Sequence, residues 1–595
     1  MRHLFLGNEA IAYGALAAGV AVAAGYPGTP SSEIIEALME FKDRWVRWAA
    51  NEKVAVEIAY GAALAGARAL AAMKHVGLNV AADPLHSAAY TGVNGGLLIV
   101  SADDPSMWSS QNEQDNRWYG LQAYLPVLEP SNPADAYAMA KDGLLLSESL
   151  GLPVLLRSVT RVSHVRAPLE VEPPAPPRWG DFKKAPSRYV LVPQNAKERR
   201  KELLKKWELA ADLSARYISV EGDGEVDVVA SGVAFEYAAE AVEALGVRAR
   251  LIKVGMPVPA PRKLADMLNG EAVVVVEEGD PVLEMQLRSM GVRTKGKIDG
   301  YFPKAGELTL RAVEAGIARV LGISFSLPDP PKPPLEPPAR PPYFCPGCPH
   351  MGTFYALKIA AAGQKVVWSG DIGCYTLGVN TGQQDLVTHM GSSLGLGMGI
   401  AEADKGKLVV ATIGDSTFYH SALPQLVDLS ASRAPLLLVV MDNNYTAMTG
   451  GQPSPSRDVP AERVAEAFGI RAYVTDPADV EKSVEVFKRA VAEAKSGPVV
   501  VVSKRPCTLE ALRVARRSGF KPPRYYVDPS ACRACGICYN LLKCYAISRL
   551  LDGKAWIDPG LCNGCSMCAQ VCPYDAIKTN EPGKVKEWLE LWSRA

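Results

Sequence analysis

Short apolar segments alternate with helical patterns rich in small residues through residues 1–168. The stretch from Ala10 to Tyr26 has the pattern of a helix that runs into a strand, and Gly96 to Val100 is another short apolar strand. Loops rich in Pro, Gly, Ser and Asp follow these strands. This alternation predicts a doubly wound α/β domain.

The same alternation recurs twice, in residues 221–326 and 343–520. We expect strands at Val226 to Ala230, Ala249 to Val254 and Ala272 to Glu277, and then at Leu408 to Ile413, Pro435 to Met441 and Val499 to Val502. The connecting segment 169–220 includes a highly charged stretch after Asn195, which is typical of a solvated helix. Residues 327–342 are nine-sixteenths proline and predict a semi-rigid linker.

Charge and composition limit the classes of partner. The chain has 595 residues with 64 Lys and Arg against 64 Asp and Glu, so no net charge would attract nucleic acid or an anionic membrane surface. The apolar run from Ala10 is interrupted by glycines and lacks a basic flank, so we expect neither a signal peptide nor a membrane span. Without an export signal we expect a cytoplasmic chain, whose thiols stay reduced, so the 12 cysteines predict metal binding.

Eight of these cysteines lie in residues 525–580, ahead of a short amphipathic tail at 581–595. Cys562, Cys565, Cys568 and Cys572 match the C-x2-C-x2-C-x3-C-P run of bacterial ferredoxins, and Cys532, Cys535, Cys538 and Cys544 form a looser copy. In such runs the fourth cysteine ligates the other cluster, so one 4Fe-4S cluster is expected on Cys532, Cys535, Cys538 and Cys572, and another on Cys562, Cys565, Cys568 and Cys544. Structural zinc is the alternative, although zinc usually takes two C-x2-C pairs.

Polar residues end two expected strands of the third α/β domain. Gly414, Asp415 and Ser416 follow one strand, and Asn443 follows the next, 28 positions after Asp415. The carboxyl ends of adjacent parallel strands are where open α/β sheets bind ligands. Asp and Asn oxygens suit Mg2+ that bridges phosphates, and Gly414 would let a diphosphate approach the backbone. A βαβ turn without a cofactor is the alternative interpretation.

This spacing resembles the GDG and Asn motif of thiamine diphosphate enzymes, with Ser416 in place of the last glycine. The resemblance implies that Asp415 and Asn443 ligate Mg2+ through their side chains and Tyr445 through its carbonyl. Such enzymes also need a glutamate from a second domain against the aminopyrimidine ring. Glu52, nine residues before Gly61, has the spacing of that family, and Glu57 is the competing candidate.

Residues 25–33, GYPGTPSSE, resemble the substrate loop of 2-oxoacid:ferredoxin oxidoreductases, which implies that Thr29 faces the substrate. A turn leading into a Ser-capped helix is the purely structural interpretation. The four cysteines still unassigned are Cys345, Cys348, Cys374 and Cys507. Their contexts resemble the cysteine segments of this family and imply a third 4Fe-4S cluster beside the thiamine, with zinc or a remnant site as the alternative. His75 and His350 lie near these motifs, but a lone histidine is more often structural.

The segment from Ala102 to Gly120, which contains DDPSMWSSQNEQD, is similar to the large alpha subunits of the indolepyruvate branch of this family. The resemblance covers nearly the whole chain. It implies a pyrimidine-binding domain at 1–168, a transketolase C-terminal-like domain at 221–326, a diphosphate-binding domain at 343–520 and a bacterial-ferredoxin-like domain at 525–580. Pyruvate-type relatives have SNTGGQ where this chain has Met448 and Thr449 in AMTGGQ, and a methionine there suits an apolar or aromatic substrate.

The function implied is oxidative decarboxylation of an aryl 2-oxoacid to an arylacetyl-CoA, with thiamine diphosphate, Mg2+ and three 4Fe-4S clusters as cofactors. Coenzyme A, external ferredoxin and a small beta subunit would be its partners, in a hetero-oligomer. Three alternatives stay open. They are an oxidoreductase for pyruvate or branched-chain 2-oxoacids, a non-oxidative decarboxylase, and an electron-transfer or scaffold subunit whose thiamine site has decayed, which Ser416 keeps under consideration.

Overall fold

The computed structural model describes residues 2–268, 273–326, 331–338 and 341–595. The chain divides into two compact units, Met1–Lys332 and Pro333–Ala595, and each is described by itself. The division falls inside the proline-rich segment 327–342, of which residues 327–330 and 339–340 lie outside the described part. No helix among the described residues is long and apolar enough to span a membrane.

The first unit contains a six-stranded parallel sheet with the order β3-β2-β4-β5-β7-β6. Its strands are β2 (Val22–Gly25), β3 (Trp45–Trp48), β4 (Ala69–Lys74), β5 (Leu97–Asp103), β6 (Val127–Leu128) and β7 (Val154–Val159). The chain places β3 on one side of β2 and β4 on the other, so the strand order reverses between β2 and β4. Open α/β sheets bind ligands outside the carboxyl ends of the strands at such a switch point.

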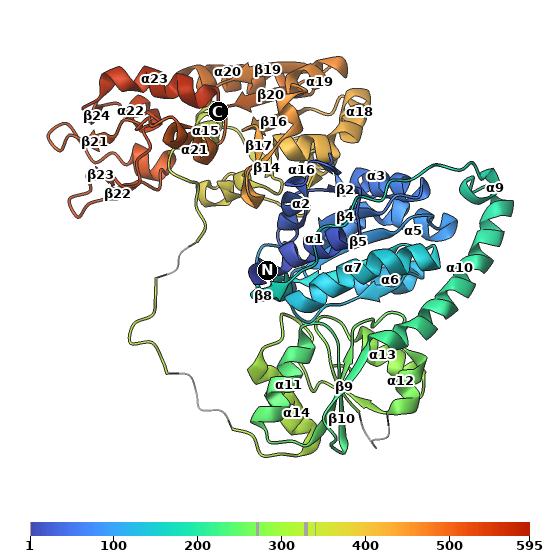
Figure 1. Cartoon of the computed structure of the whole chain (residues 1–595). Helices are drawn as coiled ribbons and strands as arrows, with labels where there is room; N and C mark the ends of the chain where they lie inside the picture. Colours follow the sequence, from blue (N-terminus) through green and yellow to red (C-terminus); the bar gives the residue numbers. More distant parts are fainter. Residues whose placement is uncertain (1, 269–272, 327–330, 339–340) are drawn as a thin grey trace. The chain divides into compact units, whose positions relative to one another are not determined.

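Helices cover both faces of this sheet (Figure 1). Helix α1 (Gly7–Ala17) packs on α7 (Pro133–Leu150) and α2 (Ser32–Met39), and α3 (Glu52–Leu64) packs on α5 (Ala82–Thr91). Gly14 lets α1 approach α7 closely, because a Cβ there would collide with the Tyr137 carbonyl. The remaining elements are α4 (His75–Val80), α6 (Arg117–Ala123), α8 (Thr160–His164) and the antiparallel pair β1 (Arg2–Leu6) and β8 (Arg166–Glu170).

A second sheet in the same unit has the order β13-β12-β10-β11-β9, and only its edge strand β9 is antiparallel within the described residues. The strands are β9 (Ile218–Glu221), β10 (Val226–Ala230), β11 (Ala249–Val254), β12 (Val273–Val276) and β13 (Thr294–Lys295). Helices α11 (Ala234–Ala244) and α14 (Leu310–Leu321) cover one face, and α12 (Arg262–Met267) and α13 (Val282–Ser289) the other (Figure 1). The short α9 (Pro186–Tyr189) and the long, largely exposed α10 (Pro193–Leu213) connect the two sheets.

Two buried arginines join the first and second sheets. Arg117 donates hydrogen bonds to Asp115 and to Glu277 of the second sheet, with Nη1 2.8 Å from the Glu277 oxygen. Arg157 pairs with Asp103 at 2.6 Å and with Glu129, and its Nη1 donates to the Glu278 carbonyl after β12 at 3.3 Å. Burying these charges is tolerated because each faces an opposite charge. Residues 104–116 form a loop, called here the 104–116 loop. The network holds the C-terminal end of this loop against the second sheet.

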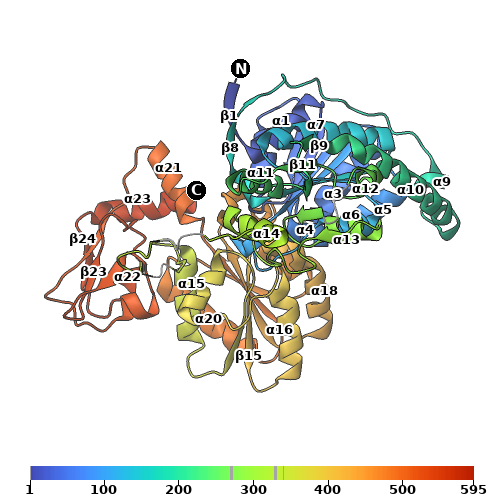
Figure 2. The same ribbon diagram turned by 90° about the horizontal axis from the view of Figure 1, so that it is seen from below.

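The second unit contains a five-stranded parallel sheet with the order β14-β15-β16-β20-β19. Its strands are β14 (Val366–Ser369), β15 (Leu408–Gly414), β16 (Leu436–Asp442), β19 (Arg471–Thr475) and β20 (Val499–Lys504). Figure 2 shows α15 (Pro349–Ala360) and α20 (Val480–Glu493) on one face, and α16 (Ser392–Ala403) and α18 (Leu423–Ser432) on the other. Successive residues of the central strands, such as Val409 and Val410, enter the two separate cores, as a sheet buried on both faces requires.

The cysteine-rich segment that follows is built on two short antiparallel pairs. Strand β21 (Tyr525–Val527) pairs with β24 (Ile577–Thr579), and β22 (Ile547–Arg549) pairs with β23 (Ala555–Ile557), with α22 (Met567–Gln570) between them in sequence. The expected fold of three doubly wound α/β domains and a small ferredoxin-like domain is therefore confirmed. Strand β12 spans Val273–Val276, and Ala272, where the strand was predicted to begin, lies outside the described residues.

The C-terminal tail is more than a surface extension. Helix α23 (Pro582–Ser593) buries Trp588 and Trp592 and packs on α21 (Thr508–Arg517). Trp592 Nε1 donates to the Pro506 carbonyl at 2.7 Å, directly before Cys507. The tail therefore holds a cysteine loop, which its amphipathic pattern alone did not reveal.

Candidate functional site

Glu52 lies beside the switch point of the first sheet. It is the first residue of α3, which follows β3, and its side chain is buried. The Asn51 side chain caps this helix by accepting a hydrogen bond from Val54 N at 2.9 Å. A Cβ on Gly77, in α4 after β4, would come within 2.6 Å of Glu52 Cγ, so the glutamate packs directly on that backbone. The competing Glu57 is exposed and pairs with Lys53 at 3.2 Å.

Thr29 lies in the loop after β2, and its carbonyl accepts a hydrogen bond from Ser109 Oγ at 3.3 Å. Ser109 belongs to the 104–116 loop, where Ser109 N donates to Asp104 Oδ2 at 2.8 Å. The Thr29 loop and Glu52 therefore follow neighbouring parallel strands, and the 104–116 loop closes on the Thr29 loop.

His75 begins α4 and is fully buried. Its Nε2 lies 3.2 Å from the Asn112 carbonyl, while its Nδ1 has no hydrogen-bond partner among the described residues. Burial lowers the pKa of His75, so the neutral ring is favoured. These contacts give His75 a role in holding the 104–116 loop, in line with the structural interpretation.

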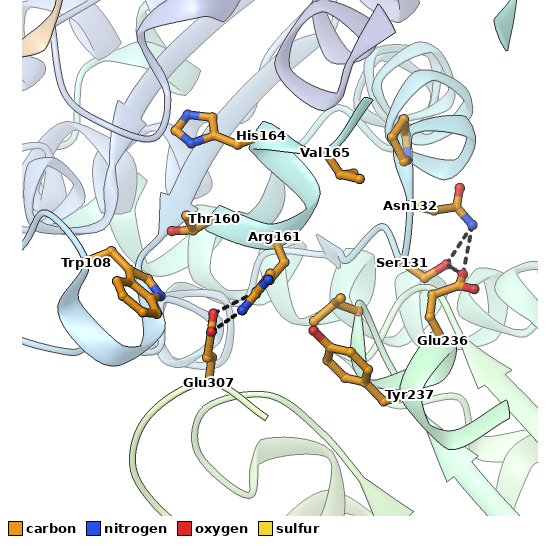
Figure 3. Close-up of a pocket in the computed structure, with 12 residues that line it drawn as sticks. Trp108, Ser131, Asn132, Thr160, Arg161, His164, Val165, Glu236, Tyr237 and Glu307 are labelled. Carbon is orange, nitrogen blue, oxygen red and sulfur yellow. Dashed lines mark hydrogen bonds and ion pairs between the residues drawn. The ribbon is translucent and has the colours of Figure 1, made fainter. Parts of the chain in front are cut away.

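A cavity of about 680 Å³ opens between the first and second sheets of this unit, with Trp108 and Tyr237 among its walls (Figure 3). Arg161 also lines it and pairs with Glu307 at 2.5 Å, and His164 lies 3.6 Å from Glu33. Both cations thus already face carboxylates. The cavity is bounded by the 104–116 loop through Trp108, which is 67% exposed.

In the second unit, Asp415 and Asp442 end the adjacent strands β15 and β16, and both are buried. Ser456 Oγ bridges them, at 3.1 Å from Asp415 Oδ2 and 2.9 Å from Asp442 Oδ1. Burial, and then the charge of Asp442, raises the pKa of Asp415 well above its usual value. Asp442 Oδ2 lacks a hydrogen-bond partner among the described residues, although Lys504 Nζ lies 3.4 Å away. Two buried carboxylates that are this poorly compensated suit a divalent cation.

Asn443 follows Asp442 directly, and its Oδ1 accepts a hydrogen bond from Tyr445 N at 3.0 Å. Its Nδ2 lies 3.5 Å from His350 Nε2, and burial lowers the pKa of His350 to about 4. Asp415 and Asn443 thus occupy the carboxyl ends of neighbouring strands, and Tyr445 is linked to the Asn443 side chain. This donor set, oxygens of Asp and Asn with a nearby carbonyl, could hold Mg2+.

Gly414 and Ser416 flank Asp415. A Cβ on Gly414 would meet the ring of Tyr375, so a contact within the protein already requires glycine here. Ser416 Oγ accepts a hydrogen bond from Thr446 Oγ1 at 3.0 Å, which gives the serine at this motif position a structural partner.

Met448 and Thr449 lie in a single 3-10 turn, Ala447–Thr449, after the Asn443 segment. The Met448 side chain is 53% exposed, whereas Thr449 Oγ1 donates to Gln452 Oε1 at 2.8 Å. The turn therefore exposes the thioether of Met448, and the hydrogen bond of Thr449 stabilises the turn.

The four cysteines of the second unit's α/β part, Cys345, Cys348, Cys374 and Cys507, lie together. Burial, and then the charges of Cys507, Cys345 and Asp415, raises the pKa of Cys374 to about 12. Burial, and then the charges of the other three thiols, also raises the pKa of Cys348. Thr508 Oγ1 donates to the Gly347 carbonyl at 2.8 Å and so ties the Cys507 loop to the loop between Cys345 and Cys348. The influence of Asp415 on Cys374 places this group beside the carboxylate pair.

The other eight cysteines fall into two groups. Burial, and then the charges of Cys535, Cys572 and Cys532, raises the pKa of Cys538 to about 11. Burial, and then the charges of Cys565, Cys544 and Cys562, raises the pKa of Cys568. Each group thus includes one cysteine from the other run, as the ferredoxin pattern predicts. Among the described residues no three His, Cys, Asp or Glu side chains are placed to hold a single metal ion.

The loop between Cys345 and Cys348 touches the group that contains Cys544. Asn563 Nδ2 donates to the Pro346 carbonyl, and a backbone hydrogen bond from Gly347 lowers the pKa of Cys544 against the raising effect of burial. In the group with Cys532, by contrast, Cys535 is exposed. The three groups therefore form a series from the carboxylate pair to the surface of this unit.

Sequence patterns did not identify Asp442, Ser456, Lys74 or Gly77 as neighbours of these groups. Asp442 could have been found, because it directly precedes Asn443 at the same strand end. Ser456 lies in a distant loop, and no local signal connects it to Asp415. Lys74 and Gly77 lie on both sides of His75, and no sequence motif marks either of them.

Three family models match the chain. "Pyruvate flavodoxin/ferredoxin oxidoreductase, thiamine diP-bdg" matches residues 13–215, "Thiamine pyrophosphate enzyme, C-terminal TPP binding domain" matches residues 362–503, and "4Fe-4S binding domain" matches residues 555–578. A solved 2-oxoglutarate:ferredoxin oxidoreductase from Magnetococcus marinus aligns with 53% of this chain and 65% of its own, with a TM-score of 0.45 and 17% identity, a likeness too weak to support an argument. The fold and site, with the family models, define a thiamine diphosphate-dependent 2-oxoacid oxidoreductase that carries iron–sulfur centres.

Two curated relatives match over nearly their full length. The indolepyruvate oxidoreductase subunit IorA of Archaeoglobus fulgidus is 41% identical, with 96% of this chain and 97% of the relative covered. The same subunit of Thermococcus kodakarensis is 41% identical, with 98% of each covered. The chain belongs to the family of indolepyruvate oxidoreductase IorA subunits. Its general reaction is the oxidative decarboxylation of a 2-oxoacid, with ferredoxin as the electron acceptor.

Proposed function

We propose that this chain acts on aryl 2-oxoacids of the indolepyruvate and phenylpyruvate type and forms arylacetyl-CoA, with electrons passed to ferredoxin. The observation that carries this proposal is the full-length similarity to two relatives named for indolepyruvate, at 41% identity. The exposed thioether of Met448, where pyruvate-type relatives have asparagine, supports an apolar substrate side chain. By the family's organisation, a small beta subunit completes the enzyme as a hetero-oligomer.

Asp415, Asn443 and the Tyr445 carbonyl would hold Mg2+ together with the diphosphate of the cofactor. The buried, poorly compensated pair of Asp415 and Asp442 supports this assignment, because a divalent cation would offset their charge. Bound thiamine diphosphate supplies the carbon nucleophile and the electron sink that 2-oxoacid decarboxylation needs.

Glu52 would exchange a proton with the aminopyrimidine ring through its carboxyl group. Its burial and its packing on Gly77 restrict the carboxyl group to one position, which a proton-transfer group requires. Thr29, in the neighbouring loop, would face the substrate.

The three cysteine groups would hold three 4Fe-4S clusters, which accept electrons one at a time. Cys345, Cys348, Cys374 and Cys507 would hold the cluster beside the thiamine. The exposed Cys535 belongs to the outermost group, which suits that group to an external ferredoxin.

Anaerobic assays of coenzyme A-dependent ferredoxin reduction with indolepyruvate, phenylpyruvate and pyruvate test the substrate class. We expect kcat/KM to be highest for the two aryl substrates, and a clear preference for pyruvate would refute the proposal. Iron analysis of the same sample tests the cluster count, since three four-iron clusters require about twelve irons per chain and two require about eight.

A further inference from the structure

We propose that Lys74 binds the carboxylate group of the 2-oxoacid substrate. This inference rests on the proposed function and adds a residue to it that determines how the substrate is oriented. The reacting carbon of a 2-oxoacid is next to an anion, so an enzyme that positions it needs a cation or several donors at that end.

Lys74 is placed at the switch point where such a ligand would enter. It is the last residue of β4, which pairs with β2, and the Thr29 loop follows β2. A Cβ on Gly28 would lie 3.2 Å from Lys74 Cβ and 3.7 Å from its Cδ, so the lysine stem runs along the backbone next to Thr29. Three residues later in the chain, Gly77 packs on Glu52. Lys74 therefore begins a segment that touches both the loop expected to face the substrate and, through Gly77, the glutamate expected to face the cofactor.

The charge of Lys74 is not matched inside the protein. Within the described ranges no ion pair to Lys74 is formed, and its Nζ donates to the Ser109 carbonyl at 3.0 Å. Asp104 is the carboxylate whose charge acts on it, but Asp104 already accepts hydrogen bonds from Ser109, Ser110 and Thr160. Burial lowers the pKa of Lys74 to about 8 in spite of Asp104. Lys74 is half-buried, and an ammonium partly withdrawn from water without a counterion is costly, so an anionic ligand would offset that cost.

Four other basic side chains of this unit each already lie beside a carboxylate, so they are poorly suited to bind the substrate carboxylate. Arg157 pairs with Asp103, Arg161 pairs with Glu307, and His164 lies 3.6 Å from Glu33. Arg117 is fully buried against Asp115. Lys74 differs from these four because, among the residues that the structure describes, its ammonium group donates to a neutral backbone oxygen and to no carboxylate.

The test uses the thiamine-loaded holoenzyme, with its partner subunit, and the variants Lys74→Met and Lys74→Arg. Lys42→Met is the matched control, because Lys42 Nζ also donates to a backbone carbonyl, that of Met39 at 2.9 Å, but is exposed. The ligands are indole-3-propionate, an unreactive carboxylate, and indole-3-propionamide, its neutral counterpart. Calorimetry measures their binding, and turnover of indolepyruvate is measured separately.

We expect Lys74→Met to weaken binding of the carboxylate by about tenfold or more, as loss of a hydrogen bond to a charged group predicts, and to leave binding of the amide unchanged. Lys74→Arg should restore most of the carboxylate affinity, and Lys42→Met should change neither ligand. An equal loss for both ligands would show that Lys74 only supports the Ser109 loop, and no loss for either would equally overturn the inference. Failure of the wild type to oxidise any 2-oxoacid would refute the proposed function, whereas the carboxylate-specific loss is measured without turnover.

Discussion

At the scale of single residues, buried charge marks where this chain can hold ligands. Asp415 and Asp442 lie at neighbouring strand ends with one serine hydroxyl between them, and Lys74 has no counterion among the described residues. The buried Arg117 and Arg157, by contrast, each pair closely with a carboxylate. A cation bound at the carboxylate pair and an anion bound at Lys74 would give these charges partners as well.

The pKa of Lys74 leads to a prediction on pH dependence. Because kcat/KM reports the ionisation of the free enzyme, it should fall above pH about 8 as Lys74 loses its proton. Asp104 and His75 are the titratable neighbours, and both are expected to keep one charge state in that range. Lys74→Arg should remove this decline, since arginine stays protonated. A decline that persists in the arginine variant would assign it to another group.

Met448 gives a prediction on substrate preference. Its exposed thioether offers apolar contact, whereas the asparagine of pyruvate-type relatives offers hydrogen bonds. We expect Met448→Asn to lower kcat/KM for indolepyruvate by about tenfold, as loss of an apolar contact of 1–3 kcal/mol allows, and to leave pyruvate turnover equal or higher. The ratio of kcat/KM for the two substrates is the measurement. An unchanged ratio would exclude Met448 from substrate selection.

Some site residues were predictable from sequence, and the reason is local spacing. Asp415 and Asn443 end consecutive strands of a βαβ unit, so their proximity follows from the pattern itself. Ser456 and Lys74 could not be assigned in this way, because their roles depend on which distant loops fold against them. Spacing favoured Glu52 over Glu57 as the residue that faces the cofactor, and the structure buries Glu52 and leaves Glu57 exposed, in keeping with that prediction.

At the scale of elements, helix α4 positions the start of α3. Gly77 leaves no room for a side chain, since a Cβ would be 2.6 Å from Glu52. The strands themselves were predictable from their apolar runs, and β10 and β11 match the expected bounds. The packing of α23 was not, because two tryptophans in a short amphipathic segment do not specify the surface they cover.

Gly77→Ala tests this packing. The added methyl group should displace the Glu52 carboxyl group, and a misplacement of about 1 Å can lower turnover about a hundredfold. Turnover at saturating thiamine diphosphate is the measurement. Gly399→Ala is the control, because Gly399 lies in helix α16 with nothing within 4 Å of the added methyl group. Wild-type turnover in Gly77→Ala would contradict the position given to Glu52.

At the scale of the whole molecule, the buried carboxyl group of Glu278 makes the stability depend on pH. Burial raises the pKa of Glu278 to about 7, against a hydrogen bond from Leu308 N at 2.8 Å that favours its charged form. The folded state therefore binds this proton more tightly than the unfolded chain. The contribution of Glu278 to stability is greatest below pH about 4.5 and decreases as the pH rises to about 7.

Glu278→Gln should remove this dependence while its carbonyl still accepts from Leu308 N. We expect the melting temperature of the variant, relative to wild type, to be higher at pH 8 than at pH 5. The difference corresponds to at most about 3 kcal/mol, given the size of the pKa shift. Glu243→Gln, at an exposed position in α11, is the control. The same relative melting temperature at both pH values would show that Glu278 is not the source of the effect.

The three cysteine groups also belong to this scale, because each is assembled from segments far apart in the sequence. The exchange of the fourth cysteine between the two ferredoxin-like runs was predictable from their spacing. The contact of the Cys345–Cys348 loop with Asn563 was not, since it depends on how the ferredoxin-like segment packs on the third sheet.

The most direct test of the account is EPR spectroscopy of the oxidised, anaerobic holoenzyme after addition of indolepyruvate and coenzyme A without any other reductant. The account predicts signals of reduced 4Fe-4S clusters, because electrons from the 2-oxoacid should reach iron held by this chain. The same signals should be absent in Asp415→Ala, because Asp415 is the proposed ligand of the cofactor's cation. Signals that arise only with dithionite, or that persist undiminished in Asp415→Ala, would contradict the account.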